Sequence, residues 1–371
     1  MKRLATIAPR CPGSTFCFLL FGLIALFLTA GCGPEVPEKK LRRIILISNG
    51  DAPFWDACSS GVNDAEKKFK LREAGLSAEF VKNDGKVSGQ IKLLEQYLTQ
   101  NDVAAIGISV IEPDNSTLAE LMKKLRKKGV KVITVDSDID SKKYPEARRY
   151  YIGTNNRIGG NVLGICAKNM LPGGGNYATF VGYKGAQNAI DRIEGFAEGA
   201  GDKFKSIDSR EDNLIYKTAV DNVRNVLIDN DNLQMIVGIY AYNGPAAVDV
   251  VKERNSREKY KIVTFDADPR SISRMEDGMI DAMVVQDPYH MGYHGVRILK
   301  ALIEDDKATI DELKKELKPA SGAEDVFDTP LKVVVPDSGS PLKKEMFPAN
   351  VQFLKLSEFK KWLEEYGLKG S

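Results

Sequence analysis

Several loops in this 371-residue sequence place aromatic and polar side chains directly after short apolar runs. The first of these loops contains two adjacent aromatic residues, Phe54 and Trp55. Such rings could pack against a helix, but an aromatic plane also stacks on the axial C–H groups of a sugar ring. The other candidates are polar residues or a tyrosine that end such runs or open the next helix: Ser109, Asp136, Ser137, Thr154, Asn188, Arg192, Tyr242, Asn243, Asp266 and Gln286.

The elements that carry these loops alternate along the chain. Apolar runs at 44–47, 78–81, 104–108 and 130–135 predict strands, and a second set predicts four more at 177–181, 235–239, 261–265 and 282–285. Helical spacing separates them at 55–70, 87–100, 116–128, 160–170, 189–200, 216–230 and 245–254. Continuous apolar strands indicate a parallel sheet covered on both faces. The repeated pattern predicts an α/β fold of two doubly wound, Rossmann-like domains.

This fold class predicts where a ligand would bind. In open α/β sheets, ligands are contacted by the loops beyond the carboxyl ends of the strands. Two such domains in one chain form a crevice between them, a favoured place for small molecules. The candidate residues lie in these loops.

The first 31 residues have a different character. Lys2, Arg3 and Arg10 precede the apolar run 16–30, which is too short for the ~20 residues that span a bilayer. A charged start and a short apolar core are typical of a signal peptide. Small residues then lead to Cys32, and this junction resembles a bacterial lipobox, although Thr29 stands where Leu is commoner. We expect residues 1–31 to be a lipoprotein signal peptide and 32–41 a tether from a lipidated Cys32. An ordinary cleaved signal or a short membrane anchor is the alternative.

Charge and cysteine content limit the possible functions. Removing 1–31 takes three cations from 53 and no acids from 51, so the mature net charge is −1. A nearly neutral chain carries no electrostatic signature of nucleic-acid binding. Cys58 and Cys166 fall in different predicted domains, so we expect packed free thiols.

Seven motifs in order resemble the periplasmic sugar-binding proteins of ABC transporters, in their ribose-binding-like branch of the type I fold. The resemblance covers most of 43–300 and rests on the segments 52–55, 132–136, 151–156 with 159–160, 192–196, 242–243, 263–266 and 285–288. It implies an N-terminal lobe of 42–153 plus 288–329 and a C-terminal lobe of 154–287 plus 330–348. Residues 349–371 are expected to be a helical extension, with a helix over 353–366, and the chain to cross between lobes near 153–156, 266–268 and 286–288.

The resemblance also implies roles for the candidate residues. Phe54 and Trp55 would sandwich a sugar ring, and Asp136 and Asp266 would accept hydrogen bonds from hydroxyls. A carboxylate offers two acceptor oxygens for such charge-assisted bonds. Arg192 and Asn243 would donate, and Gln286 could do both. The ribose-binding pattern has Arg where Ser137 stands, another Arg where Ile190 stands and Asn where Ala52 stands, which leaves another pentose, a hexose, a polyol or a non-sugar ligand open.

The function implied is that of a monomeric, non-enzymatic, exported binding protein. It would close two lobes on a small sugar or polyol, at a membrane to which Cys32 anchors it, and deliver the ligand to an ABC permease. Sensing for a membrane receptor or kinase is the alternative. Repressors share this fold, but the lipobox occupies the place of their DNA-binding helices. We predict no cofactor and no metal, since His290 and His294 at i,i+4 spacing have no evident third ligand.

Overall fold

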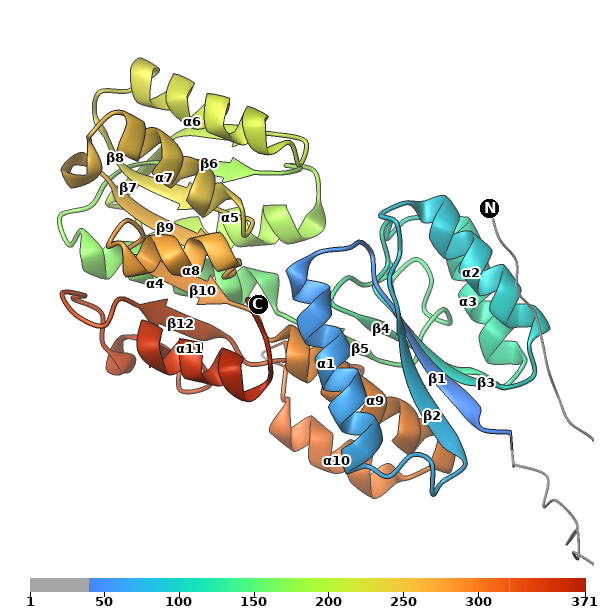
Figure 1. Ribbon diagram of the computed structural model, residues 1–371. Helices are drawn as coiled ribbons and strands as arrows, with labels where there is room; N and C mark the ends of the chain where they lie inside the picture. Colours follow the sequence, from blue (N-terminus) through green and yellow to red (C-terminus); the bar gives the residue numbers. More distant parts are fainter. Residues whose placement is uncertain (1–39, 320) are drawn as a thin grey trace, which may run out of the picture. The chain divides into compact units, whose positions relative to one another are not determined.

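The computed structural model describes residues 40–319 and 321–371, and the expected signal peptide and Cys32 lie outside them. Two separate sheets organise the described chain (Figure 1). The first has strand order β11-β5-β4-β3-β1-β2 and the second β13-β12-β10-β9-β8-β6-β7. Among the described strands, every pair is parallel except β10 with β12. The predicted α/β class with two doubly wound parallel-sheet domains is confirmed.

The first sheet contains β1 (Arg42–Ile47), β2 (Leu76–Val81), β3 (Val103–Ile108), β4 (Lys131–Val135), β5 (Tyr151–Gly153) and β11 (Val326–Asp328). Its helices are α1 (Pro53–Lys68), α2 (Val87–Thr99), α3 (Ser116–Lys127), α9 (Pro288–Glu304) and α10 (Lys307–Glu316). Alternate residues of one strand face opposite layers, because side chains alternate along a strand. Thus Ile44 and Leu46 pack with α1 and α9, whereas Ile45 and Ile47 pack with α2 and α3.

The second sheet contains β6 (Gly175–Val181), β7 (Phe204–Glu211), β8 (Leu233–Gly238), β9 (Lys261–Phe265), β10 (Ala282–Val285), β12 (Lys332–Val335) and β13 (Gln352–Lys355). Its helices are α4 (Asn156–Met170), α5 (Gln187–Ala200), α6 (Tyr216–Asp229), α7 (Asn243–Glu253), α8 (Pro269–Glu276) and α11 (Leu356–Glu365). Two short 3₁₀ helices lie at Arg257–Lys259 and Lys344–Met346. Phe180 packs in the core under α6, α7 and α11, and its neighbour Val181 in the core under α4 and α5.

Three connections pass between the sheets, and one differs from expectation. The chain leaves the first sheet after β5, returns to it from β10 through α9, and crosses again between β11 and β12. The passages therefore lie near 153–156, 285–288 and 329–331. The predicted passage at 266–268 is wrong, because β9, α8 and β10 all belong to the second sheet and its packing.

The C-terminal segment also differs from its prediction. Residues 352–355 are not helical but form β13, which pairs in parallel with β12, and the helix begins at Leu356. The apolar residues of β13 continue into the helical spacing of α11, so periodicity alone joins the two elements. Phe359 and Leu363 of α11 pack into the core of the second sheet.

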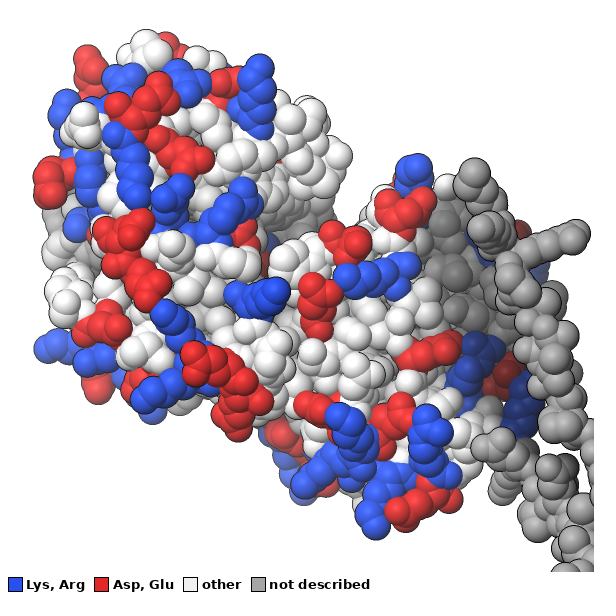
Figure 2. Space-filling model, in the orientation of Figure 1, with Lys and Arg blue, Asp and Glu red and all other residues white. Residues whose placement is uncertain are grey.

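Cys58 and Cys166 are buried free thiols, as predicted, and burial raises the pKa of each above its ordinary value. Acidic and basic side chains alternate over the described face in Figure 2. Within the described ranges, no helix combines the length and apolarity needed to cross a bilayer.

Candidate functional site

The strand ends carry a cluster of charged side chains around Arg192. This residue, on α5, is only 4% exposed. Its Nε donates to Asn156 Oδ1 (2.9 Å) and its Nη1 donates to the carbonyl of Ile239 (3.1 Å). The guanidinium carbon lies 3.9 Å from the centroid of the Phe265 ring. These contacts fix a buried cation at the carboxyl edge of the second sheet.

Asp266, which follows β9, lies beside this cation. Its Oδ2 is 3.9 Å from Arg192 Nη1. Gln286, which follows β10, donates from its backbone N to Asp266 Oδ1 (3.1 Å) and from Nε2 to Asp266 Oδ2 (2.9 Å). Burial raises the pKa of Asp266, while Arg192 and the two bonds from Gln286 oppose that rise. Asp266 and Gln286, both predicted ligand residues, therefore form a hydrogen-bonded pair.

Asp136, which follows β4, is the corresponding carboxylate of the first sheet. Ser109, at the end of β3, donates from Oγ to its Oδ2 (3.3 Å), and Tyr151 Oη donates to its backbone O (3.0 Å). Burial raises the Asp136 pKa to about 6. Arg192 and the Ser109 bond oppose the rise, and the negative charge of Asp266 adds to it. The Asp136 carboxylate, which follows a strand of the first sheet, is thus influenced by the charges of Arg192 and Asp266 at the second sheet.

Both aspartates have an unusual backbone. Their φ angles are +64° for Asp136 and +60° for Asp266, in the left-handed region that residues other than Gly, Asn and Asp rarely adopt. Such conformations cost of order 1–3 kcal/mol each and cluster at functional sites. This left-handed conformation turns the backbone sharply after β4 and again after β9, and it leaves both carboxylates at the strand ends.

Two polar atoms at these strand ends have no partner in the described structure. Thr154 Oγ1 and Gln286 Oε1 are both buried without a hydrogen bond. An unpaired buried polar atom costs about 1–3 kcal/mol. Because Gln286 Nε2 donates to Asp266, the amide oxygen Oε1 of Gln286 remains free to accept a hydrogen bond from a ligand hydroxyl or amine.

Three further predicted residues lie around the loop after β8. Asn243 is buried, and its Nδ2 donates to Asp212 Oδ2 (2.9 Å). The hydroxyl of Tyr242 donates to the other oxygen of Asp212. Asn188 Oδ1 accepts from Tyr240 Oη (3.1 Å). The structure brings Asn188 and Tyr240 to the Arg192 cluster, because the Tyr240 ring lies 5.8 Å from the guanidinium.

The two aromatic candidates have different environments. Trp55 is 4% exposed and packs in the core of the first sheet, with its ring centroid 6.0 Å from that of Phe80. Phe54 is partly exposed and meets Trp55 edge-on at 4.9 Å. Part of the Phe54 ring is therefore accessible for stacking on a ligand, and Trp55 contacts this ring from the core side. Within the described residues, Ser137 bonds through its backbone: its N donates to Val135 O, and its O accepts from Val110 N.

Sequence reasoning missed two hydrogen-bonding partners of the predicted residues, the buried Asp212 and the half-buried Asn156. Asp212 orients Tyr242 and Asn243, yet it follows β7, whose polar sequence did not identify it as a strand. Asn156 opens α4 and holds Arg192. Its strand, β5, is only three residues long. A search of strand ends would have found both residues if these two strands had been recognised.

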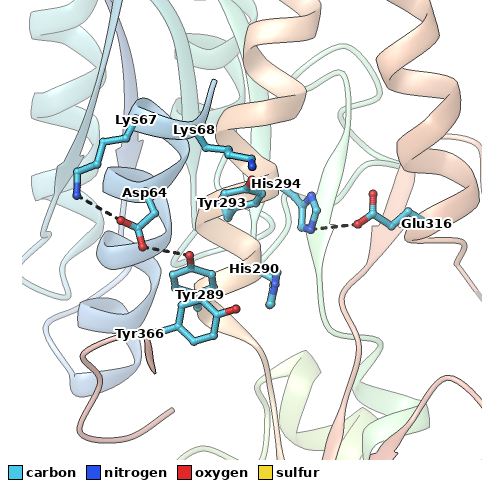
Figure 3. Close-up of a pocket in the computed structure, with 9 residues that line it drawn as sticks. All are labelled: Asp64, Lys67, Lys68, Tyr289, His290, Tyr293, His294, Glu316 and Tyr366. Atoms are coloured by element: carbon cyan, nitrogen blue, oxygen red, sulfur yellow. Dashed lines mark hydrogen bonds and ion pairs between the residues drawn. The ribbon is translucent and has the colours of Figure 1, made fainter. Parts of the chain in front are cut away.

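A pocket lies away from this cluster, among α1, α9, α10 and the turn after α11 (Figure 3). Its volume is about 640 Å³, and none of the predicted ligand residues lines it. Several lining groups pair with each other: Tyr289 Oη with Asp64 (3.1 Å), and His294 Nε2 with Glu316 (3.7 Å). Burial lowers the pKa of His294 to about 3. Among the described residues, no group of three or more His, Cys, Asp or Glu could hold a metal ion.

The two doubly wound sheets and the paired strand-end aspartates define a two-lobed binding protein. A family model described as "Periplasmic binding protein domain" matches residues 44–307, and the chain belongs to this family. This is a family of binding proteins and not of enzymes. The ribose import binding protein of Bacillus subtilis (strain 168) is 23% identical over 281 residues, 72% of this chain and 87% of that protein.

Two solved structures extend the comparison. An ABC transporter solute-binding protein from Burkholderia graminis, in complex with D-arabinose, is 28% identical with a TM-score of 0.67, over 81% of this chain and 99% of that one. A chain of the XylFII–LytSN complex is 28% identical with a TM-score of 0.61, over 71% of this chain and 94% of that one.

Proposed function

We propose that this protein is an exported solute-binding lipoprotein that captures a small sugar or related polyol and delivers it to an ABC permease. The observation that carries the proposal is the cluster of Asp136, Asp266 and Arg192 at the strand ends of two sheets, in which Asp266 and Arg192 are buried and Asp136 is half-buried. Two carboxylates whose pKa values are raised by burial gain from hydroxyl donors, which replace the water that burial removes.

The binding mechanism that we propose is hinge closure. The moving bodies are 42–153 plus 288–329 and 154–287 plus 330–348, joined by the three passages described above. Asp136, Ser109 and Phe54 come from the first body, and Asp266, Arg192 and Gln286 come from the second. A ligand shifts an open–closed equilibrium only by its differential affinity for the two states. Contacts from both bodies provide that difference.

A sugar is favoured over other small ligands by the composition of the cluster. Carboxylates, an amide acceptor at Gln286 Oε1 and a guanidinium suit hydroxyl groups, and the half-buried ring of Phe54 suits the apolar face of a pyranose or furanose. A relative named for ribose import and a solved solute-binding protein in complex with D-arabinose support the same ligand class. The ring size and stereochemistry stay open, because Ser137 and Ile190 replace the Arg residues of the ribose-binding pattern.

The first experiment is a thermal-shift screen of residues 40–371, which form one compact unit, against pentoses, hexoses, polyols and nucleosides. A ligand at a thousand times its Kd adds ~4 kcal/mol to the free energy of unfolding. Isothermal titration then compares the wild type with Asp136→Asn and Asp266→Asn. A hit that both variants lose supports the site, and turnover of the bound sugar would refute a binding protein.

A sensing role is the second candidate, and the similarity to a chain of the XylFII–LytSN complex supports it only in that this structure is a complex of two named components. Uptake of the labelled ligand in cells with and without the protein distinguishes transport from sensing. We propose that Cys32 anchors either form, and mass spectrometry of the membrane-bound protein tests this by detecting an acylated Cys32 at its N-terminus. Two acyl chains would make that anchor stable where one would not.

A further inference from the structure

The segment from α11 to Ser371 runs from the core of the second lobe to the candidate ligand site. After α11, Gly367 has a φ of +64°, so the chain turns there without the strain that a side chain would cause. Ser371, the last residue of the sequence, is 4% exposed and lies against the loops that follow β9 and β10.

Ser371 makes three hydrogen bonds with these loops. Its backbone N donates to Ala267 O (3.0 Å), and Ala267 N donates to Ser371 O (2.8 Å). The Ser371 hydroxyl donates to Gln286 O (2.9 Å). The approach is close enough that a Cβ on Gly370 would lie 2.7 Å from Ala267 O.

The residues held in this way are neighbours of the ligand groups. Ala267 directly follows Asp266, and the Gln286 carbonyl belongs to the residue whose N and Nε2 bind the Asp266 carboxylate. Asp266 has a φ of +60°, a conformation that surrounding contacts must maintain. The two-way pairing of Ser371 with Ala267 provides such a contact on the next residue.

The other end of the segment is fixed at the passage between lobes. Lys332 Nζ lies 4.1 Å from the centroid of the Trp362 ring of α11, and this lysine forms an ion pair with Asp287. Both charged residues are 0% exposed. Tyr366 packs on Tyr289, the second residue of α9, with ring centroids 4.1 Å apart (Figure 3).

We propose that residues 356–371 are a positioning element for the ligand site. Through backbone contacts to Ala267 and Gln286, this segment holds Asp266 and Gln286 in binding geometry. Ser371 touches the backbone that carries the ligand groups and not the ligand itself. The proposal rests on the proposed function for its effect on affinity, but its effect on the two loops is independent of any ligand.

The test compares four variants of residues 40–371. Deletion of 367–371 removes all Ser371 contacts, Ser371→Ala removes only the hydroxyl bond, and Ser371→Thr keeps a hydroxyl. Lys369→Ala is the matched control, because Lys369 is an exposed residue of the same segment. Circular dichroism melting first confirms that each variant is folded.

Amide hydrogen exchange of the ligand-free protein is the first measurement. The deletion should raise exchange at least tenfold at Ala267 and in peptides covering 264–268 and 284–288, with β1 and β3 unchanged. Unchanged exchange at 264–268 would overturn the proposal, whether or not any sugar binds.

Calorimetric titration with D-ribose, D-arabinose and D-allose is the second measurement. For a sugar that the wild type binds, the deletion should raise Kd tenfold or more. Loss of one hydrogen bond costs ~0.5–1.5 kcal/mol, so Ser371→Ala should raise Kd about 2–10-fold, and Ser371→Thr should restore it. An unchanged Kd in the deletion would also overturn the proposal. If none of these three sugars binds even the wild type, they are excluded as ligands and the exchange result alone decides the positioning role.

Discussion

Replacement of Asp136 by Asn should separate the stability of this protein from its ligand binding. Burial raises the Asp136 pKa from 3.8 to about 6 in the ligand-free protein. Each pKa unit corresponds to ~1.4 kcal/mol, so above pH 6 the ionised carboxylate costs up to about 3 kcal/mol of the free energy of unfolding. Asn is the suitable replacement, because it tolerates the φ of +64° that Ala would not.

The sign of the pH effect follows from the raised pKa. The unfolded state releases its proton near pH 4 and the folded state near pH 6, so stability falls as pH rises through this window. Wild type and Asp136→Asn should therefore have similar stability near pH 4. At pH 7.5 the variant should be more stable by up to about 3 kcal/mol, while its affinity for any ligand of the wild type falls at least tenfold.

The assay is urea unfolding of residues 40–371 at pH 4.5, 6 and 7.5, followed by calorimetric titration with the ligand found by screening. Asp138→Asn is a useful contrast, because that carboxylate accepts from Arg148 in a salt bridge of the first lobe. Its loss should destabilise the protein. A variant Asp136→Asn that is less stable than wild type at pH 7.5, or one that binds ligand normally, would refute the reasoning.

Three further outcomes follow from the same structure. Ligand affinity should weaken as pH falls through about 6, as Asp136 takes up a proton and loses acceptor capacity, and a Kd that is constant from pH 5 to 8 would count against its role. Phe54→Ala should weaken ligand binding and change the free energy of unfolding less than Trp55→Ala does. Trp55→Ala removes a core ring and should lower the free energy of unfolding by ~3–5 kcal/mol. Urea unfolding measures the stability effect of each variant, and calorimetric titration measures its effect on binding. Gly160→Ala should destabilise the second lobe, since a Cβ there would lie 2.1 Å from the carbonyl O of Arg192, and normal melting of this variant would contradict the close packing of α4 on α5.

Much of the architecture could be predicted from the sequence because it depends on local patterns. Buried parallel strands need apolar side chains on both faces, so Ile44 to Ile47 and Lys261 to Phe265 identify β1 and β9 without knowledge of their partners. The strand-end rule then pointed to Asp136, Asp266 and Gln286, three residues that the structure places at the charged cluster or beside it.

Elements stabilised mainly by their neighbours could not be predicted in this way. Strand β7 lies at the edge of its sheet, with a polar sequence and one partner, β6, so its apolar pattern is weak. Asp212, at its end, was missed for that reason. Strand β13 exists because β12 offers it a free edge, although its apolar spacing continues the helix that follows.

The sequence by itself determined the fold class and the two-lobed plan and supplied the residue types of the candidate site, because hydrophobic periodicity and turn chemistry are local properties. Only the tertiary structure decided that Trp55 is a core residue and Phe54 a half-buried one, that Arg192 lies against Asp266, and that Ser371 returns to Ala267. These outcomes depend on burial and on contacts between residues far apart in the chain, for which no local pattern carries a signal.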